Sequence, residues 1–127
     1  MKQACVLAVD DSPINQMLMV ELLEGLKLSV DTAENGKKAI ECCEQKNYDI
    51  IFMDLEMPVM DGHKAVIHLR QTLKCYNPII ALTGHDKAHI FKTLKEDGFS
   101  GFLKKPVSEE KLKHLVYSHL PSLKPKA

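Results

Sequence analysis

The fold is decided by residues 50–58, which read Ile50-Ile51-Phe52-Met53-Asp54-Leu55-Glu56-Met57-Pro58. A short apolar run that is bounded by polar residues and a proline is typical of a strand buried on both faces of a parallel sheet. Asp54 stands where that run ends. Because open α/β sheets place their ligand sites outside the carboxyl ends of the strands, the stretch indicates both a sheet and a functional carboxylate.

Two other segments of the chain repeat this pattern. One is Cys5-Val6-Leu7-Ala8-Val9, which ends in Asp10-Asp11, and the other is Phe102-Leu103, which leads into Lys104-Lys105-Pro106. Parallel strands bring their carboxyl ends to the same edge of a sheet, so we expect three acids and a lysine to meet there. This arrangement indicates a cation site around a nucleophile.

The rest of the chain alternates strand and helix. We expect strands at about 4–9, 29–33, 48–53, 78–82 and 101–103, and helix starts at Ser12-Pro13, Asn35-Gly36, Asp61-Gly62, Asp86 and Ser108. Short connections imply right-handed crossovers, and therefore a doubly wound, five-stranded parallel sheet of order 2-1-3-4-5 with five helices on both faces. Residues 1–120 form the predicted domain, and residues 121–127 form a tail or linker.

Helical spacing also predicts which side chains of the helices face the core. In the first helix the apolar residues at this spacing are Ile14, Met17, Leu18, Leu22 and Leu26. We expect this stripe to pack against the sheet.

Composition excludes several classes of function. The chain has 127 residues, with 17 lysines and arginines against 17 aspartates and glutamates, so no strong field favours nucleic acid. No apolar stretch reaches membrane-spanning length. The four cysteines have neither disulfide nor metal-ligand spacing, and adjacent Cys42-Cys43 indicate reduced thiols on a helix. These features favour a cytoplasmic protein or the cytoplasmic part of a membrane-bound one.

The predicted cluster of charges has a specific chemistry. Three carboxylates in one crevice repel one another unless a cation joins them, and hard oxygen ligands suit Mg²⁺, for which Mn²⁺ can substitute. An aspartate can attack phosphorus and form an aspartyl phosphate. The oxygens of the transferred phosphoryl group then need positive charge and hydrogen-bond donors, which Lys105 and the Thr83 hydroxyl can supply.

Four segments together resemble the receiver domain of two-component response regulators: Val9-Asp10-Asp11-Ser12, residues 53–62 (Met53-Asp54-Leu55-Glu56-Met57-Pro58-Val59-Met60-Asp61-Gly62), Ile80-Ala81-Leu82-Thr83 and Lys105-Pro106-Val107. The resemblance covers nearly the whole chain and implies the flavodoxin-like receiver fold. Asn15-Gln16 and the stretch from Met57 to Gly62 are more similar to receivers of hybrid sensor kinases than to those of transcription factors.

The resemblance implies a role for each matching residue. Asp54 is the expected phosphoacceptor, and Asp10, Asp11, Asp54 and the backbone carbonyl of Glu56 are the expected metal ligands. The site lysine is Lys105, because the family's lysine directly precedes a proline, and the Lys105–Pro106 bond is a candidate cis peptide. The switch pair is Thr83 and Phe102. The side chains two residues after Asp54 and Thr83, which are Glu56 and His85, are candidate modulators of hydrolysis.

The implied function is that of a phosphoacceptor in a phosphorelay. Asp54 receives a phosphoryl group from a histidine kinase or a histidine phosphotransfer protein, and the surface formed by the fourth helix, fifth strand and fifth helix changes. Such a domain is no conventional enzyme, although it promotes its own phosphorylation and dephosphorylation. We expect a monomer or a weak phosphorylation-dependent dimer, with no binding of nucleic acid by this domain alone.

Three other kinds of protein share part of this pattern. A haloacid-dehalogenase-like phosphatase also uses an aspartate nucleophile with Mg²⁺, but its nucleophile precedes its other acids, whereas Asp10-Asp11 come first here. A flavodoxin-type flavin binder needs a loop rich in hydroxyl groups and glycine after the first strand. A pseudo-receiver that acts only as an interaction module typically lacks part of the acid or lysine set, and this chain has all of it.

Overall fold

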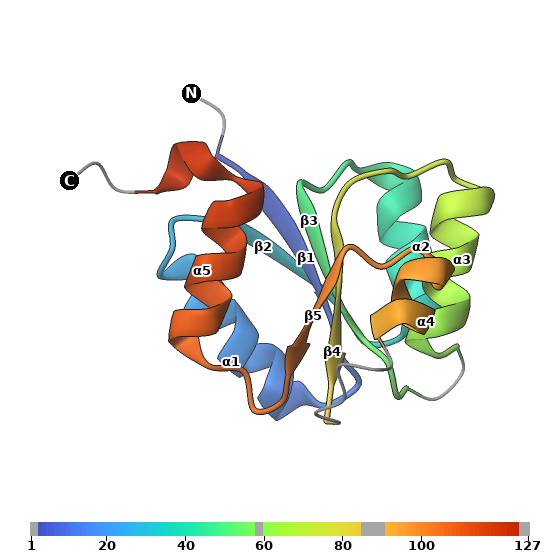
Figure 1. The fold of residues 1–127 in the computed structure, drawn as a ribbon, viewed down its shortest axis with the longest axis horizontal. Helices are drawn as coiled ribbons and strands as arrows, with labels where there is room; N and C mark the ends of the chain where they lie inside the picture. Colours follow the sequence, from blue (N-terminus) through green and yellow to red (C-terminus); the bar gives the residue numbers. More distant parts are fainter. Residues whose placement is uncertain (1–2, 58–59, 85–90, 125–127) are drawn as a thin grey trace.

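The structure is a computed structural model that describes residues 3–57, 60–84 and 91–124. Its centre is a five-stranded parallel sheet in the order β2-β1-β3-β4-β5 (Figure 1). The strands are β1 Cys5–Val9, β2 Ser29–Ala33, β3 Ile50–Asp54, β4 Ile79–Thr83 and β5 Gly101–Lys104. The predicted strand order is therefore confirmed, and the order reverses between β1 and β3.

Five helices cover the two faces of this sheet. They are α1 Pro13–Glu24, α2 Gly36–Gln45, α3 Gly62–Gln71, α4 Phe91–Asp97 and α5 Glu109–His119, followed by the short 3₁₀ helix η2 Pro121–Leu123. Helices α1 and α5 lie on one face, and α2, α3 and α4 lie on the other (Figure 1). Leu123 of η2 packs against the α1–α5 side of the core.

The central strands β1, β3 and β4 are apolar up to their carboxyl ends because both of their faces are covered. In β3, Ile50 and Phe52 face the core under α1 and α5, whereas Ile51 and Met53 face the core under α2, α3 and α4. All four side chains are fully buried. Burial of each stabilises the fold by roughly 1.5–3 kcal/mol, so β3 is a firm support for the residue that ends it.

Polar side chains begin four of the helices as predicted. Ser12, Asn35, Asp61 and Ser108 each accept a hydrogen bond from the backbone N–H three residues further on. Each bond satisfies one of the N–H groups that a helix start leaves without a partner. The cap expected from Asp86 lies outside the described residues.

The predicted core stripe of α1 is wrong in its first half. Ile14, Met17 and Leu18 are 70%, 71% and 54% exposed, whereas Met19 and Leu23 are buried. This helix carries apolar residues on two adjacent faces, and helical spacing alone does not say which of them meets the sheet. The result is an apolar surface on α1, formed by Ile14, Met17 and Leu18, which we call the α1 surface.

Arg70 of α3 links the loops at the amino ends of β4 and β5 by hydrogen bonds. Its guanidinium donates hydrogen bonds to the backbone carbonyls of Cys75 (2.7 Å), Asn77 (2.7 Å) and Gly98 (2.9 Å). The first two carbonyls belong to the loop before β4, and the third belongs to the loop between α4 and β5. One side chain therefore fixes the loops opposite the edge that carries the acids.

Two predictions from composition can be compared with the structure. All four cysteines are free thiols, and Cys42 and Cys43 lie on α2. Among the described residues, no helix has both the length and the apolar character needed to cross a membrane.

Candidate functional site

Three carboxylates meet at the carboxyl ends of β1 and β3. These strands pair in parallel, with Val9 opposite Met53, so Asp10 and Asp54 lie side by side. Asp10 and Asp54 are 2% and 1% exposed, whereas Asp11 is exposed. One oxygen from each of the three carboxylates lies within 4.8 Å of the others. The structure thus brings together the acids that the strand ends predicted.

Lys105 completes this cluster from the neighbouring side of the sheet. Its Nζ lies 2.9 Å from Asp54 Oδ1 and 3.4 Å from Asp10 Oδ2. Its backbone N–H donates to the carbonyl of Thr83 at 2.7 Å, and the Lys105–Pro106 bond is cis, as the resemblance implied. Lys104 is exposed at the end of β5. Of the two adjacent lysines, Lys105 is the one whose ion pairs with Asp54 and Asp10 place it in the cluster.

The electrostatics of the pair follow from burial and proximity. Burial raises the pKa of the Asp54 carboxyl above its usual value, against the opposing effects of Lys105 and the Glu56 N–H. Burial by itself lowers the pKa of Lys105, but the hydrogen bond and the charges of Asp54 and Asp10 outweigh it and raise that pKa. Lys105 is therefore held in its charged form beside the carboxylates.

The donor set fits a hard divalent cation. Asp10 Oδ1 accepts a hydrogen bond from the Ser12 N–H at 2.9 Å, but Asp10 Oδ2 is buried and has no hydrogen-bond partner among the described residues. Its one cationic contact is Lys105 Nζ at 3.4 Å among the described residues, and a divalent cation would add the direct contact that a buried carboxylate oxygen without a hydrogen bond lacks. The three carboxylates with one lysine leave two net negative charges, which a single divalent ion would balance.

The other predicted residues surround this cluster. The Glu56 N–H donates to Asp54 Oδ1 at 3.2 Å, and the Glu56 side chain is exposed. Thr83 is fully buried at the end of β4. Phe102 of β5 is partly buried, and its ring packs against Phe91 of α4 with centroids 5.4 Å apart. His85, the second candidate modulator, lies outside the described residues.

Two features of the site were not predicted as such. A cavity of about 490 Å³ is lined by Leu18 of the α1 surface together with Asp10, Lys105 and Pro106, so this surface reaches the acid cluster. Gln16 of α1 hydrogen-bonds to the ends of two strands. Helical spacing placed Leu18 in the core, and no local sequence signal indicates a contact between Gln16 and β2.

Comparison with known proteins agrees with this geometry. Residues 6–117 match the family described as response regulator receiver domain. The signal transduction histidine-protein kinase BarA of Escherichia coli K12 is 38% identical over 122 residues, which cover 91% of this chain and 13% of BarA. Two-component response regulator 24 of Arabidopsis thaliana is 35% identical over 112 residues, with coverage of 87% and 80%. The chain thus spans about an eighth of BarA but most of the plant regulator.

Solved structures give the same result. The receiver domain of sensor histidine kinase PA1611 from Pseudomonas aeruginosa, with a magnesium ion coordinated in its active-site cleft, matches with a TM-score of 0.84, 29% identity and coverage of 94% and 99%. A chain in the co-crystal structure of the Saccharomyces cerevisiae histidine phosphotransfer protein Ypd1 and the receiver domain of Ssk1 matches with a TM-score of 0.85, 28% identity and coverage of 91% and 87%. The chain therefore belongs to the family of response regulator receiver domains and acts in two-component phosphorelays.

Proposed function

We propose that Asp54 is the residue of this receiver domain that becomes phosphorylated. The observation that carries the proposal is the position of Lys105 Nζ, 2.9 Å from Asp54 Oδ1 and within 3.4 Å of Asp10 Oδ2. In the reaction, the P–N bond of a phosphohistidine breaks as a P–O bond to the Asp54 carboxylate forms. Lys105, already charged, compensates the negative charge on the phosphoryl oxygens.

Asp10, Asp11, Asp54 and the backbone carbonyl of Glu56 would hold Mg²⁺, or Mn²⁺ in its place. The buried Asp10 Oδ2, which accepts no hydrogen bond among the described residues, and the excess of negative charge support this assignment, as does the magnesium ion of the PA1611 receiver. When bound, the ion neutralises negative charge on the phosphoryl group. Asp10 and Asp54 would hold the ion from the ends of the buried strands β1 and β3.

Thr83 and Phe102 form the proposed link to the output surface. The Thr83 hydroxyl would turn toward the phosphoryl group, and the Phe102 ring would move into the space that it leaves. The contact between Phe102 and Phe91 supports this route, because a moving Phe102 ring must repack against α4. The phosphoryl group would thereby shift the populations of two arrangements of α4, β5 and α5.

The phosphoryl donor would be a histidine kinase or a histidine phosphotransfer protein that docks on the α1 surface. Three exposed apolar side chains form an unusual patch on a small domain, and Leu18 lines the cavity that contains Asp10 and Lys105. A partner seated there can bring its phosphohistidine to Asp54. The receiver of Ssk1, crystallised with Ypd1, provides a parallel for such a partner.

The match to 13% of the length of the histidine-protein kinase BarA supports the proposal that this receiver domain is part of a larger kinase. Glu56 and His85 remain proposed modulators of phosphoryl lifetime. The exposed Glu56 carboxylate, two residues from Asp54, would repel the phosphoryl charge modestly.

Mass spectrometry tests the phosphoacceptor directly. With acetyl phosphate and Mg²⁺, the intact mass of the chain should rise by one phosphoryl group, and Asp54→Asn should abolish the increase. Asp61→Asn is a matched control, because asparagine retains the helix-capping acceptor of Asp61 and this residue lies outside the cluster. Undiminished labelling of Asp54→Asn, or its loss in Asp61→Asn, would overturn the assignment.

A further inference from the structure

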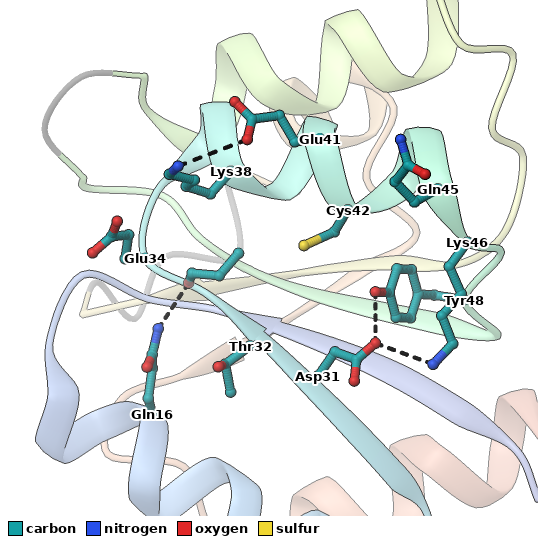
Figure 2. Close-up of a pocket in the computed structure, with 11 residues that line it drawn as sticks. Gln16, Asp31, Thr32, Glu34, Lys38, Glu41, Cys42, Gln45, Lys46 and Tyr48 are labelled. Carbon is teal, nitrogen blue, oxygen red and sulfur yellow. Dashed lines mark hydrogen bonds and ion pairs between the residues drawn. The ribbon is translucent and has the colours of Figure 1, made fainter.

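One side chain of α1 connects the ends of two neighbouring strands beside the acid cluster. The Gln16 Nε2 group donates hydrogen bonds to the carbonyl of Asp10, after β1, and to the carbonyl of Ala33, at the end of β2, both at 2.8 Å. Figure 2 shows the Gln16 amide pointing at the β2 end. The Asp10 N–H donates to the same Ala33 carbonyl at 3.1 Å. A closed set of hydrogen bonds thus links α1, β1 and β2.

These bonds fix the peptide unit that joins Asp10 to Asp11. The carbonyl of Asp10 belongs to that unit, and the planar peptide leaves rotation only at the two flanking Cα atoms. Asp10 is further held by the hydrogen bond from the Ser12 N–H to its Oδ1. The direction in which the Asp11 side chain leaves the backbone therefore depends on the Gln16 amide.

Asp11 has little else to hold it in place. It is exposed, and within residues 3–57, 60–84 and 91–124 its carboxylate has no hydrogen-bond or ion-pair partner, in contrast to Asp10 and Asp54. Nevertheless, an oxygen of Asp11 lies within 4.8 Å of oxygens of both other acids. An exposed carboxylate stays close to two like charges only if its backbone is constrained, because repulsion and side-chain entropy both favour its departure.

We propose that Gln16 is a positioning residue for the divalent-cation site: it orients the Asp10–Asp11 peptide and so holds Asp11 ready as a metal ligand. This inference rests on the proposed function of the acid cluster. Partners behind the metal-ligating groups commonly set how tightly a site holds its ion. Loss of the Gln16 donor should therefore weaken Mg²⁺ binding even though Gln16 touches none of the carboxylate oxygens.

Uncharged substitutions of Gln16 distinguish a role in positioning Asp11 from a general contribution to the stability of the fold. Gln16→Met keeps the length of the side chain and removes the donor. Gln16→Asn keeps the amide but is one methylene too short to span both carbonyls, and it provides a second variant if the first does not fold. Gln45→Met is the matched control, because Gln45 and Gln16 both line a second cavity, which lies beside β2 (Figure 2), and Gln45 makes no hydrogen bond among the described residues.

The measurement is a titration with MgCl₂, without a phosphoryl donor, followed by the amide shifts of the folded proteins in NMR spectra. The Mg²⁺ dissociation constant should rise roughly 3- to 10-fold in both Gln16 variants, as expected for the loss of about one hydrogen bond's effect on an equilibrium. The Gln45→Met constant should equal that of the parent. Urea unfolding in EDTA measures the stability of each metal-free protein, and the increase in its midpoint on adding Mg²⁺ should be smaller in the Gln16 variants.

Equal Mg²⁺ affinity in the parent and the Gln16 variants would overturn the role of Gln16 but not the proposed metal site. So would a lower midpoint in EDTA with an unchanged increase on adding Mg²⁺, since that result describes a purely structural side chain. An equal loss of affinity in Gln45→Met would also overturn it. A parent chain that binds no Mg²⁺ would overturn this inference together with the proposed metal site, whereas the mass increase of Asp54 tests the phosphoacceptor separately.

Discussion

Gly62, the first residue of α3, offers a sharp test of how the fold supports Asp54. A Cβ atom added at this position would lie 2.4 Å from the carbonyl oxygen of Asp54 and 3.0 Å from the Cα of Leu55. The first distance is about 1 Å shorter than an ordinary van der Waals contact. Both atoms belong to the backbone, so no side-chain rotation can relieve the clash. Gly62→Ala must therefore push the start of α3 away from the end of β3.

We expect this substitution to lower the free energy of unfolding by about 2 kcal/mol, within the range for overpacked sites. It should also reduce phosphorylation of Asp54, because the displaced carbonyl adjoins the proposed nucleophile. Gly84→Ala, at the same edge of the sheet, is the control, since a Cβ there meets no atom of the described residues within 4 Å. Urea unfolding and intact-mass labelling provide the two measurements. Equal stability of the two variants would refute the argument from close approach.

Three further predictions concern other parts of the domain. Arg70→Met should lower the free energy of unfolding by about 3 kcal/mol, because it leaves three backbone carbonyls without their charged donor; a urea-measured loss under about 1 kcal/mol would contradict this. The Tyr48 hydroxyl, with Lys46, lowers the pKa of Asp31, so its carboxylate stabilises the fold at neutral pH and this contribution is lost as pH falls through the lowered pKa. Asp31→Asn should accordingly cost under about 1 kcal/mol at neutral pH, with the difference from the parent shrinking below about pH 4; a constant difference would be inconsistent with it. Met17→Ala should slow phosphoryl transfer from a histidine phosphotransfer protein roughly fivefold without changing labelling by acetyl phosphate; equal slowing of both reactions would count against docking on the α1 surface.

Local sequence patterns were enough to predict the sheet. The predicted strands lie within a few residues of the observed ones, and short polar motifs such as Ser12-Pro13 predicted the helix starts. These signals suffice because a strand covered on both faces has to be apolar at every position, as Ile50 and Ile51 show on opposite faces of β3. Right-handed crossovers then left one common order at this length.

The face that α1 presents to the sheet could not be predicted in the same way. Met17 and Met19 are both apolar and only two residues apart, yet one is 71% and the other 3% exposed. Which of them is buried depends on how the helix is rotated about its axis, and in this rotation Met19 and Leu23 enter the core under α1 and α5. A docking surface requires apolar residues in exposed positions. The α1 surface, where the predicted core stripe is wrong, is therefore a candidate interface.

For the acid cluster, chain order predicted the members but not their contacts. Asp10, Asp54 and Lys105 follow strand ends, and the sheet topology alone brings them to one edge. The hydrogen bonds of Gln16 depend instead on where β2 ends relative to α1, a distance that no local pattern encodes. Sequence therefore predicts the groups that react, whereas the groups that orient them emerge only from the packed structure.

The charges of the cluster connect Lys105, the proposed cation site and the proposed phosphoacceptor. Lys105 offsets part of the repulsion between the buried Asp10 and Asp54 carboxylates. It leaves Asp10 Oδ2 without a hydrogen bond and two negative charges in excess, so the site favours a divalent cation. A phosphoryl group on Asp54 would compete for the same Lys105 ammonium that now contacts Asp54 Oδ1. The backbone N–H of Lys105 donates a hydrogen bond to the carbonyl of Thr83. A shift of the Lys105 backbone would therefore act on the end of β4, where the proposed switch begins.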